Sequence, residues 1–215
     1  MKKSEATREK ILEAALRLFR KRGFDRTTMR DVAAAADLAV GAAYYYFPSK
    51  DALVLAYYDR TQEAHTTLAR EGMKQATSLD GRLRAVLHTK IDTIERDRKL
   101  LSALFRSIGD PTSELSIFAS KTRRVRDESI ALFREALAPE NLPPELETSL
   151  ALAFWSMSMG LVLFFIHDES PKHRKTRLLV DRSVELVAPM LPMAPLLAPL
   201  GAPLLATLRE VGLAD

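Results

Sequence analysis

Two short helices joined by a tight turn are predicted by residues 27–50, which read TTMRDVAAAADLAVGAAYYYFPSK. Thr28 is a favourable N-cap for the first helix, and Asp31, three residues later, suits the exposed amides and positive end of that helix. A break at Asp37 interrupts the alanine-rich run and is too short for a flexible linker. Pro48 ends the second helix, because its ring removes a backbone donor and restricts the preceding residue. The stretch therefore reads as helix, turn and helix.

The second helix, residues 40–47, places four consecutive aromatic residues after a run of small ones. Small residues such as Gly41 and Ala42 let a helix backbone approach a base edge or a phosphate, and tyrosine hydroxyls can hydrogen-bond phosphate oxygens. One short helix cannot bury side chains on all its faces. We therefore expect Phe47 and one tyrosine to pack in the core and the other two tyrosines to face nucleic acid; the alternative is that all four aromatic side chains are core.

The order of features in residues 7–60 resembles the DNA-binding domain of the TetR family of transcriptional regulators. The resemblance rests on the first helix, TREKILEAALRLFRKRGF, the core quoted above and the start of a fourth helix, DALVLAYY. An aromatic-rich second helix, a Phe-Pro-Ser-Lys sequence and a preceding Gly-Phe occur together in the same order. The chain departs from the family at Ala43, where a larger apolar residue is more common, and at Tyr45, where histidine or another polar or aromatic residue often stands. These departures bear on the base preference and not on the fold.

The resemblance implies a ligand-responsive dimeric regulator, more often a repressor, whose two recognition helices read a near-palindromic operator about one DNA turn apart. The predicted DNA-binding residues are Thr27, Thr28, Arg30, Gly41, Ala42, Tyr44, Tyr45, Tyr46 and Lys50. Those expected to hold phosphates are mainly Thr28, Tyr44, Tyr46 and Lys50. Those expected nearest the bases are Gly41, Ala42 and Tyr45.

The distribution of charge and the absence of cysteine fit this interpretation. Residues 1–60 carry 12 lysines and arginines against 8 aspartates and glutamates, so the whole formal net charge of +4 lies there. A dimer would double this charge, and phosphate binding strengthens with each neutralised contact. The lack of cysteine excludes disulfides and thiolate metal sites and fits a reducing cytoplasmic location. No signal peptide is predicted at the N-terminus.

Helical periodicity along the remaining chain predicts an all-α fold with two domains. We expect a three-helix DNA-binding domain at residues 1–50 and a helical ligand-binding and dimerisation domain at residues 51–215, linked by a fourth helix over residues 50–73. The first helix is expected to end at Gly23, after which Phe24 folds back into the small core. Further helices are predicted at residues 79–97, 99–108, 114–138, 145–167 and 176–191, with a short helix near 203–211.

In the family that the chain resembles, the last two long helices build a four-helix interface between subunits and the others enclose a small-molecule pocket. The homodimer interface is therefore expected at residues 145–167 and 176–191, where a symmetric partner would cover a helix that is apolar on every side. The predicted ligand-binding residues are His65, Leu68, Ile91, Phe105, Phe118, Phe133, Trp155 and Met159. Because most of them are apolar, a hydrophobic effector is expected. The alternative is that these side chains simply pack in the core.

The C-terminal part carries no motif for catalysis or for a cofactor. Residues 79–191 contain no Gly-rich phosphate loop, no HExxH and no GxSxG, so neither an enzyme nor a cofactor is predicted. His167 and His173 lack regular metal-ligand spacing. Residues 150–166 approach membrane hydrophobicity, but a buried bundle helix is the better interpretation. Two other classes remain open: a helical small-molecule-binding or protein-interaction module that has lost DNA binding, and an enzyme with a polar cluster in the C-terminal bundle.

Overall fold

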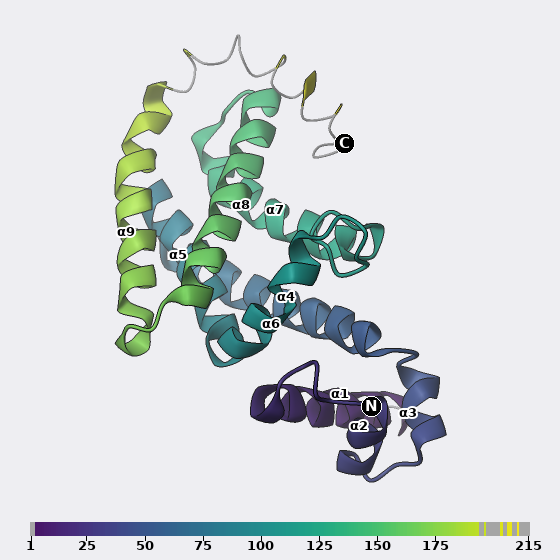
Figure 1. The fold of residues 1–215 in the computed structure, drawn as a ribbon. Helices are drawn as coiled ribbons and strands as arrows, with labels where there is room; N and C mark the ends of the chain where they lie inside the picture. Colours follow the sequence, from purple (N-terminus) through teal and green to yellow (C-terminus); the bar gives the residue numbers. More distant parts are fainter. Residues whose placement is uncertain (1–2, 194–195, 197–202, 204–205, 208–209, 211–215) are drawn as a thin grey trace. The chain divides into compact units, whose positions relative to one another are not determined.

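The computed structural model describes residues 3–193, 196, 203, 206–207 and 210, and every regular element in these residues is a helix (Figure 1). The helices are, in chain order, α1 (Lys3–Arg22), α2 (Met29–Ala35), α3 (Val40–Tyr46), α4 (Lys50–Gln75), α5 (Leu79–Ile94), α6 (Arg98–Gly109), α7 (Arg123–Leu137), α8 (Pro144–His167) and α9 (Arg174–Val187). Short 3-10 helices are η1 (Glu95–Asp97), η2 (Ser120–Thr122), η3 (Ala138–Glu140), η4 (Pro171–His173) and η5 (Ala188–Met193). The predicted all-α fold is confirmed. The short helix expected near residues 203–211 falls largely outside the described residues.

The chain divides into two compact units that do not follow the boundary expected at residue 50. The first unit comprises residues 1–61 and 96–125, and the second comprises residues 62–95 and 126–215. Helix α6 therefore groups with the N-terminal helices, whereas α4 and α7 each contribute residues to both units.

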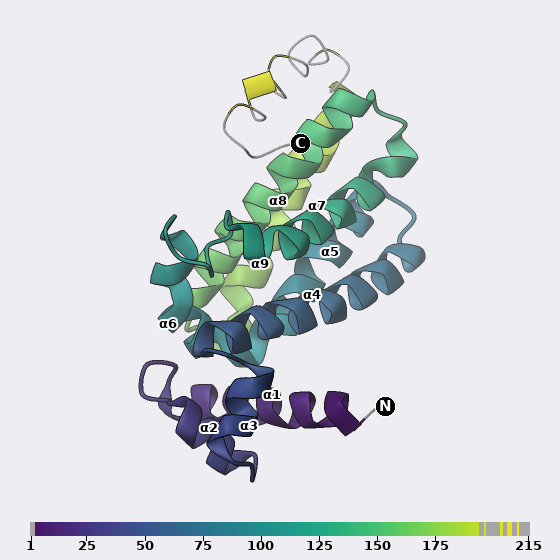
Figure 2. The same ribbon diagram turned by 90° about the vertical axis from the view of Figure 1, so that its right-hand side faces the viewer.

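The core of the first unit forms where α2 packs against both α1 and α3 (Figure 2). Phe19 of α1, Val32 of α2 and Phe47, which follows α3, are buried there. Helix α1 ends at Gly23, whose φ of 91° suits glycine and whose amide donates to the Phe19 carbonyl at 3.0 Å. The Phe24 ring then meets the Phe19 ring edge-on, with centroids 5.2 Å apart. The predicted end of the first helix and the return of Phe24 are confirmed.

An ion pair with α1 holds the start of the segment 96–125 in the first unit. Buried Asp97 accepts from Arg20 Nε at 2.5 Å and from Arg20 Nη2 at 3.2 Å.

The helix predicted over residues 114–138 is wrong in its first part, since α7 begins only at Arg123. Residues 110–119 form successive turns instead, because hydroxyl and carboxylate side chains bond the local backbone. For example, Thr122 Oγ1 donates to the Ser116 carbonyl at 2.5 Å.

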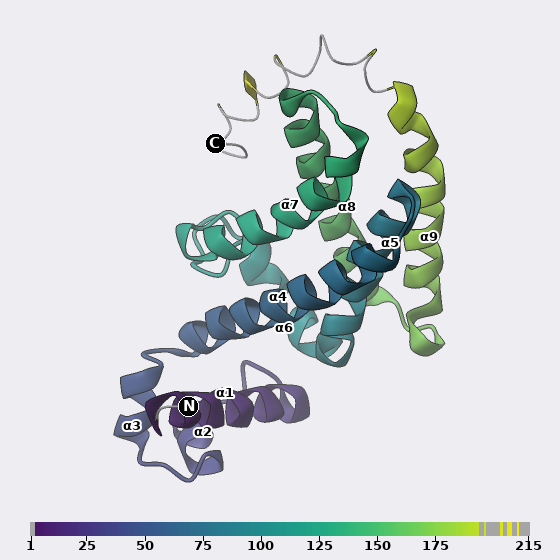
Figure 3. The same ribbon diagram turned by 180° about the vertical axis from the view of Figure 1, so that it is seen from behind.

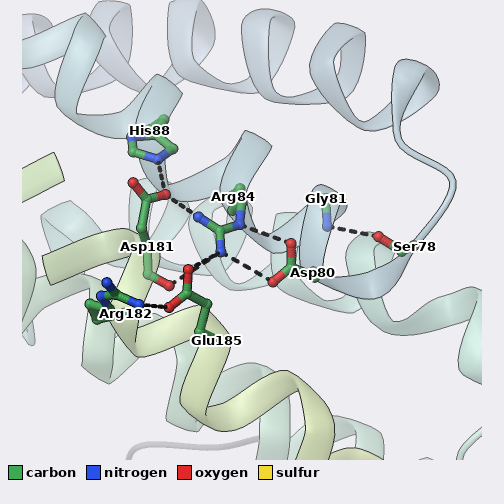
Figure 4. Close-up of polar contacts among 8 residues, drawn as sticks. All are labelled: Ser78, Asp80, Gly81, Arg84, His88, Asp181, Arg182 and Glu185. Atoms are coloured by element: carbon green, nitrogen blue, oxygen red, sulfur yellow. Dashed lines mark hydrogen bonds and ion pairs between the residues drawn. The ribbon is translucent and has the colours of Figure 1, made fainter. Parts of the chain in front are cut away.

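The second unit is built around α5, α8 and α9, and α5 and α9 lie side by side (Figures 1 and 3). An ion-pair network joins these two helices (Figure 4). Arg84 of α5 pairs with the Asp181 carboxylate of α9, donates to Asp80 Oδ2 at 2.8 Å and lies 3.4 Å from Glu185 Oε1. His88 Nε2 lies 2.9 Å from Asp181 Oδ1. Each of these polar groups therefore has a partner across or along the helix contact.

Helix α8 is followed by a corner that Asp168 organises. This buried carboxylate accepts from the Ser170 amide at 2.9 Å, from the Thr176 amide at 2.8 Å and from Thr176 Oγ1 at 2.7 Å. Burial opposes ionisation of Asp168, but these hydrogen bonds prevail and hold its pKa below the ordinary range. Helix α8 itself is long and apolar enough to cross a membrane. Half of its most apolar stretch is nevertheless buried inside the chain, where α8 packs against α5 and α9.

Candidate DNA-binding surface

Helix α2 begins with a reciprocal cap between Thr28 and Asp31. Thr28 Oγ1 accepts from the Asp31 amide at 3.1 Å, while the Thr28 amide donates to Asp31 Oδ2 at 2.9 Å. Hydrogen bonds from the Thr28 hydroxyl and amide lower the pKa of Asp31 to about 2, and Arg22 Nη2, 2.8 Å from Asp31 Oδ2, adds to this shift. The predicted N-cap is confirmed, and it fixes the direction in which α2 leaves the loop.

The turn between α2 and α3 depends on one residue in the left-handed region. Asp37 has φ 53°, a conformation that aspartate adopts more readily than most side chains. The amide of the next residue, Leu38, bonds back to the Ala33 carbonyl at 3.0 Å. This closure holds the two short helices in one rigid unit, because α2 and α3 then pack directly on each other.

Helix α3 is held by one face and presents the other to solvent. Ala43 and the adjoining Phe47 are buried, whereas Tyr44 and Tyr45 are 49% and 81% exposed. Gly41 is also exposed, and a Cβ added there would meet nothing within 4 Å. Half-buried Tyr46 packs its ring edge-on to Tyr45, with centroids 5.2 Å apart. The alternative in which all four aromatic side chains are core is therefore wrong.

The other predicted DNA-binding residues differ in what they contact. Arg30 of α2 is exposed and Ala42 of α3 is half-buried. Thr27, in contrast, is buried, and its hydroxyl donates to the Gly23 carbonyl at 2.8 Å. Lys50 Nζ donates to the Phe24 carbonyl at 3.0 Å and lies 4.3 Å from the centroid of that ring. Thr27 and Lys50 thus stabilise the loop between α1 and α2, a role that their residue types did not suggest.

Comparison with known families agrees with this geometry. A family model described as bacterial regulatory proteins of the tetR family matches residues 11–57. A second, described as a tetracyclin repressor-like C-terminal domain, matches residues 82–200, which is more than half of the chain. The chain belongs to the TetR family. This confirms the resemblance that the helix-turn-helix sequence had indicated.

Individual relatives of this TetR-family chain match it to different extents. The transcriptional regulator TtgR of Pseudomonas putida is 32% identical over 124 residues, which cover 58% of this chain and 49% of TtgR, so the chain spans about half the length of that relative. A regulator from the dhlA 5′ region of Xanthobacter autotrophicus is 30% identical over 176 residues, covering 78% of this chain and 80% of its own. A TetR-family regulator from Streptomyces coelicolor has a TM-score of 0.66 at 22% identity, covering 94% of this chain and 89% of that structure, which shows a shared fold.

The predicted ligand-binding residues of this TetR-family chain are divided between the two compact units. Phe105 and Phe118 belong to the first unit and are exposed. The other predicted positions belong to the second unit, and they are His65, Leu68, Ile91, Phe133, Trp155 and Met159. Leu68 is exposed, Met159 is half-buried and the rest are buried. The structure therefore does not bring all of the predicted ligand-binding residues together in one unit.

Sequence reasoning missed two polar residues that lie beside His65 in the second unit. Gln62 of α4 is buried, and its Oε1 lies 3.4 Å from Lys90 Nζ of α5. A signal was present, since Lys90 falls on the apolar stripe of α5 one turn after Val86 and before Ile94. A lysine at such a position is rarely buried unless it has a partner.

Proposed function

We propose that this TetR-family chain is a cytoplasmic, effector-responsive transcriptional repressor that binds a near-palindromic DNA operator as a homodimer. The observation that supports this most is the presentation of Gly41, Tyr44 and Tyr45 on the outer face of α3, while buried Ala43 and Phe47 hold its inner face. Exposed aromatic side chains beside a bare glycine backbone suit the major groove of DNA better than they suit water.

The proposed contacts divide into those with phosphates and those with bases. Tyr44 and Tyr46, with Arg30 from α2, supply hydroxyls and a guanidinium that suit phosphate oxygens. Gly41, Ala42 and Tyr45 lie nearest the base edges in this proposal. The residues that stabilise the preceding loop and cap act indirectly, by fixing the direction of α2, and they are Thr27, Thr28 and Lys50.

Exposed, mainly apolar stripes on α8 and α9 support a homodimer through residues 145–167 and 176–191. Exposed positions recur along α8 at intervals of three and four residues, and they are Ala153, Ser156, Gly160, Leu163, Phe164 and His167. On α9 and the adjoining η5, Leu186 is 70% exposed and Met190 is 58% exposed. A second copy placing its own α8 and α9 on these stripes would bury them in a four-helix contact, as a two-fold axis requires.

The effector would act through α4, because this one helix contributes residues to both units. In this proposal a largely hydrophobic small molecule binds in the second unit, to which α4 contributes residues from Gln62 onward, while the earlier part of α4 belongs to the first unit. Binding would then favour a dimer conformation that does not fit the operator, by no more than the difference in effector affinity between the two states.

Selection of bound duplexes from a random DNA pool tests the proposal directly. The full chain should enrich a sequence with two related half-sites about one helical turn apart, and Tyr45→Ala should lose this enrichment while keeping its thermal stability. Sedimentation should show a dimer that Leu186→Glu converts to a monomer, with Leu68→Glu, another exposed leucine, as the control. No enrichment by a folded, dimeric wild type would overturn the assignment.

A further inference from the structure

Helices α4 and α5 bring a small polar cluster into the second unit. It comprises Gln62, His65 and Thr66 of α4 and Lys90 of α5. Gln62 and His65 are each 1% exposed. Gln62 Nε2 donates to Thr66 Oγ1 at 3.2 Å, and Lys90 Nζ lies 3.4 Å from Gln62 Oε1. A buried polar cluster is costly unless every member is satisfied, so its unsatisfied groups are informative.

His65 offers a buried acceptor with no donor. Its Nε2 lies 2.9 Å from the Val86 carbonyl, and a carbonyl only accepts, so Nε2 carries the ring proton. Burial, and next the charge of Lys90, lower the pKa of His65 to about 3, so the ring is neutral. Nδ1 is therefore a lone-pair acceptor, and it is buried without a hydrogen-bond partner among the residues that the structure describes.

Lys90 offers the complementary surplus of donors. Its ammonium has three N–H groups, and the Gln62 amide oxygen is its one acceptor among the described residues, with no carboxylate within 4.0 Å in that part of the chain. The residue retains partial exposure, but its ammonium is desolvated, which lowers the pKa to about 8. The ammonium thus remains largely charged at neutral pH, close enough to His65 for its charge to act on the ring.

We infer that Lys90 and His65 form the polar end of an effector subsite that takes a phenol-type hydroxyl. Lys90 Nζ donates to the hydroxyl oxygen, and the hydroxyl proton is donated to His65 Nδ1. A hydroxyl satisfies both residues at once, because it donates and accepts through one oxygen atom. A carboxylate would satisfy Lys90 but place acceptors against Nδ1. An aromatic hydroxyl is more acidic than an aliphatic one and therefore donates more strongly.

The surroundings suit an aromatic ring attached to that hydroxyl. Val86, whose carbonyl lies against His65, and Ile91, which follows Lys90 in α5, are both buried apolar residues, so the side chains next to the polar pair suit the rest of an aromatic molecule. This subsite names the effector class of the regulator proposed above, and it rests on that proposed function for its role in releasing DNA.

Calorimetric titration of the full chain with matched para-substituted probes tests this subsite. The probes are 4-propylphenol, its methyl ether, 4-propylbenzoate and 4-propylaniline. The phenol should bind most tightly, with the ether at least about tenfold weaker because it cannot donate to Nδ1. Lys90→Met and His65→Phe should each weaken phenol binding by about tenfold or more. Lys74→Met, which removes an exposed lysine of α4, should leave it unchanged.

Both variants are expected to fold, because Lys90→Met removes a desolvated charge and His65→Phe keeps a ring of similar size. A thermal melt checks this. Tighter binding of the benzoate, equal binding by the variants, or no binding of any probe would each overturn the subsite. Measuring operator binding on the same samples separates the two proposals. Operator binding without phenol binding refutes the subsite alone, whereas phenol binding with the expected variant pattern but no operator binding refutes the regulator.

Discussion

The outer face of α3 and the contact between α5 and α9 use polar side chains in opposite ways. On α3 the hydroxyls of Tyr44 and Tyr45 face outward without a hydrogen-bond partner among the described residues. Between α5 and α9, Arg84, Asp181 and Glu185 satisfy one another (Figure 4). Groups paired within the chain stabilise the fold, whereas exposed groups without partners are available to another molecule. Substitutions on α3 should therefore change binding and spare stability, and substitutions in the network should do the reverse.

The largest effect that separates these regions is expected from Gly41→Glu. A Cβ at this position meets nothing within 4 Å, so the fold should tolerate the change, and replacing a helical glycine should stabilise the protein by up to about 1 kcal/mol. A carboxylate on the proposed DNA-facing side should lower operator affinity by about 100-fold, through repulsion of phosphates and a lost close approach. Gel shifts and thermal melts measure both. Gly41→Ala is the matched control, with the same gain in stability and a smaller loss of affinity, and a destabilised Gly41→Glu protein would contradict the comparison.

The reverse pattern is expected when the network between α5 and α9 is broken. Arg84→Met leaves the carboxylates of Asp80 and Asp181 without their shared cation and should lower the free energy of unfolding by about 2 kcal/mol. Urea denaturation measures this loss. Arg182→Met is the control, since the one ion pair of exposed Arg182 among the described residues is with Glu185 of its own helix, and such surface pairs contribute about 0.5 kcal/mol or less. Equal losses in the two variants would show that the network adds nothing beyond single ion pairs.

The sequence predicted the elements that rest on local rules and missed what depends on long-range contacts. The Thr28 cap and the glycine that ends α1 follow from residue type and spacing. The role of Lys50 could not be predicted, because its acceptor, the Phe24 carbonyl, lies 26 positions earlier in the chain. The first part of the helix predicted over residues 114–138 failed because side chain to backbone bonds compete with helix formation there.

Lys90 combines features of both regions, since its ammonium is desolvated like a group in the network yet lacks a carboxylate, like a group on α3. Its folded-state pKa of about 8 lies below the ordinary value of 10.5. Between these pH values the unfolded chain binds more protons, so stability should rise with pH across this window. The gain should be on the order of 1 kcal/mol, because the partial exposure of the residue screens the full shift. Denaturation at pH 7.5 and pH 10 should show this rise in the wild type relative to Lys90→Met, and parallel curves would contradict it.

The smallest effect is expected from breaking the cap between Thr28 and Asp31. This change also separates a stabilising role from a DNA-binding role, because Asp31 lies beside the proposed DNA-binding face yet is paired within the chain. Its pKa of about 2 in the folded state lies below the ordinary value of 3.8, so its contribution is present above about pH 4 and is lost as the pH falls toward 2. Thr28→Ala removes the hydroxyl that caps α2 and should cost about 0.5 kcal/mol at pH 7. It should also flatten the loss of stability between pH 4 and pH 2, because the Asp31 carboxylate then has fewer donors.

Thr67→Ala, which removes an exposed hydroxyl from the middle of α4, should change neither the stability at pH 7 nor its loss between pH 4 and pH 2. If Thr28→Ala instead weakens DNA binding while stability and its acid dependence stay unchanged, Thr28 contacts phosphate directly. The start of α2 would then belong to the DNA-binding surface and not to the part of the chain that only stabilises the fold.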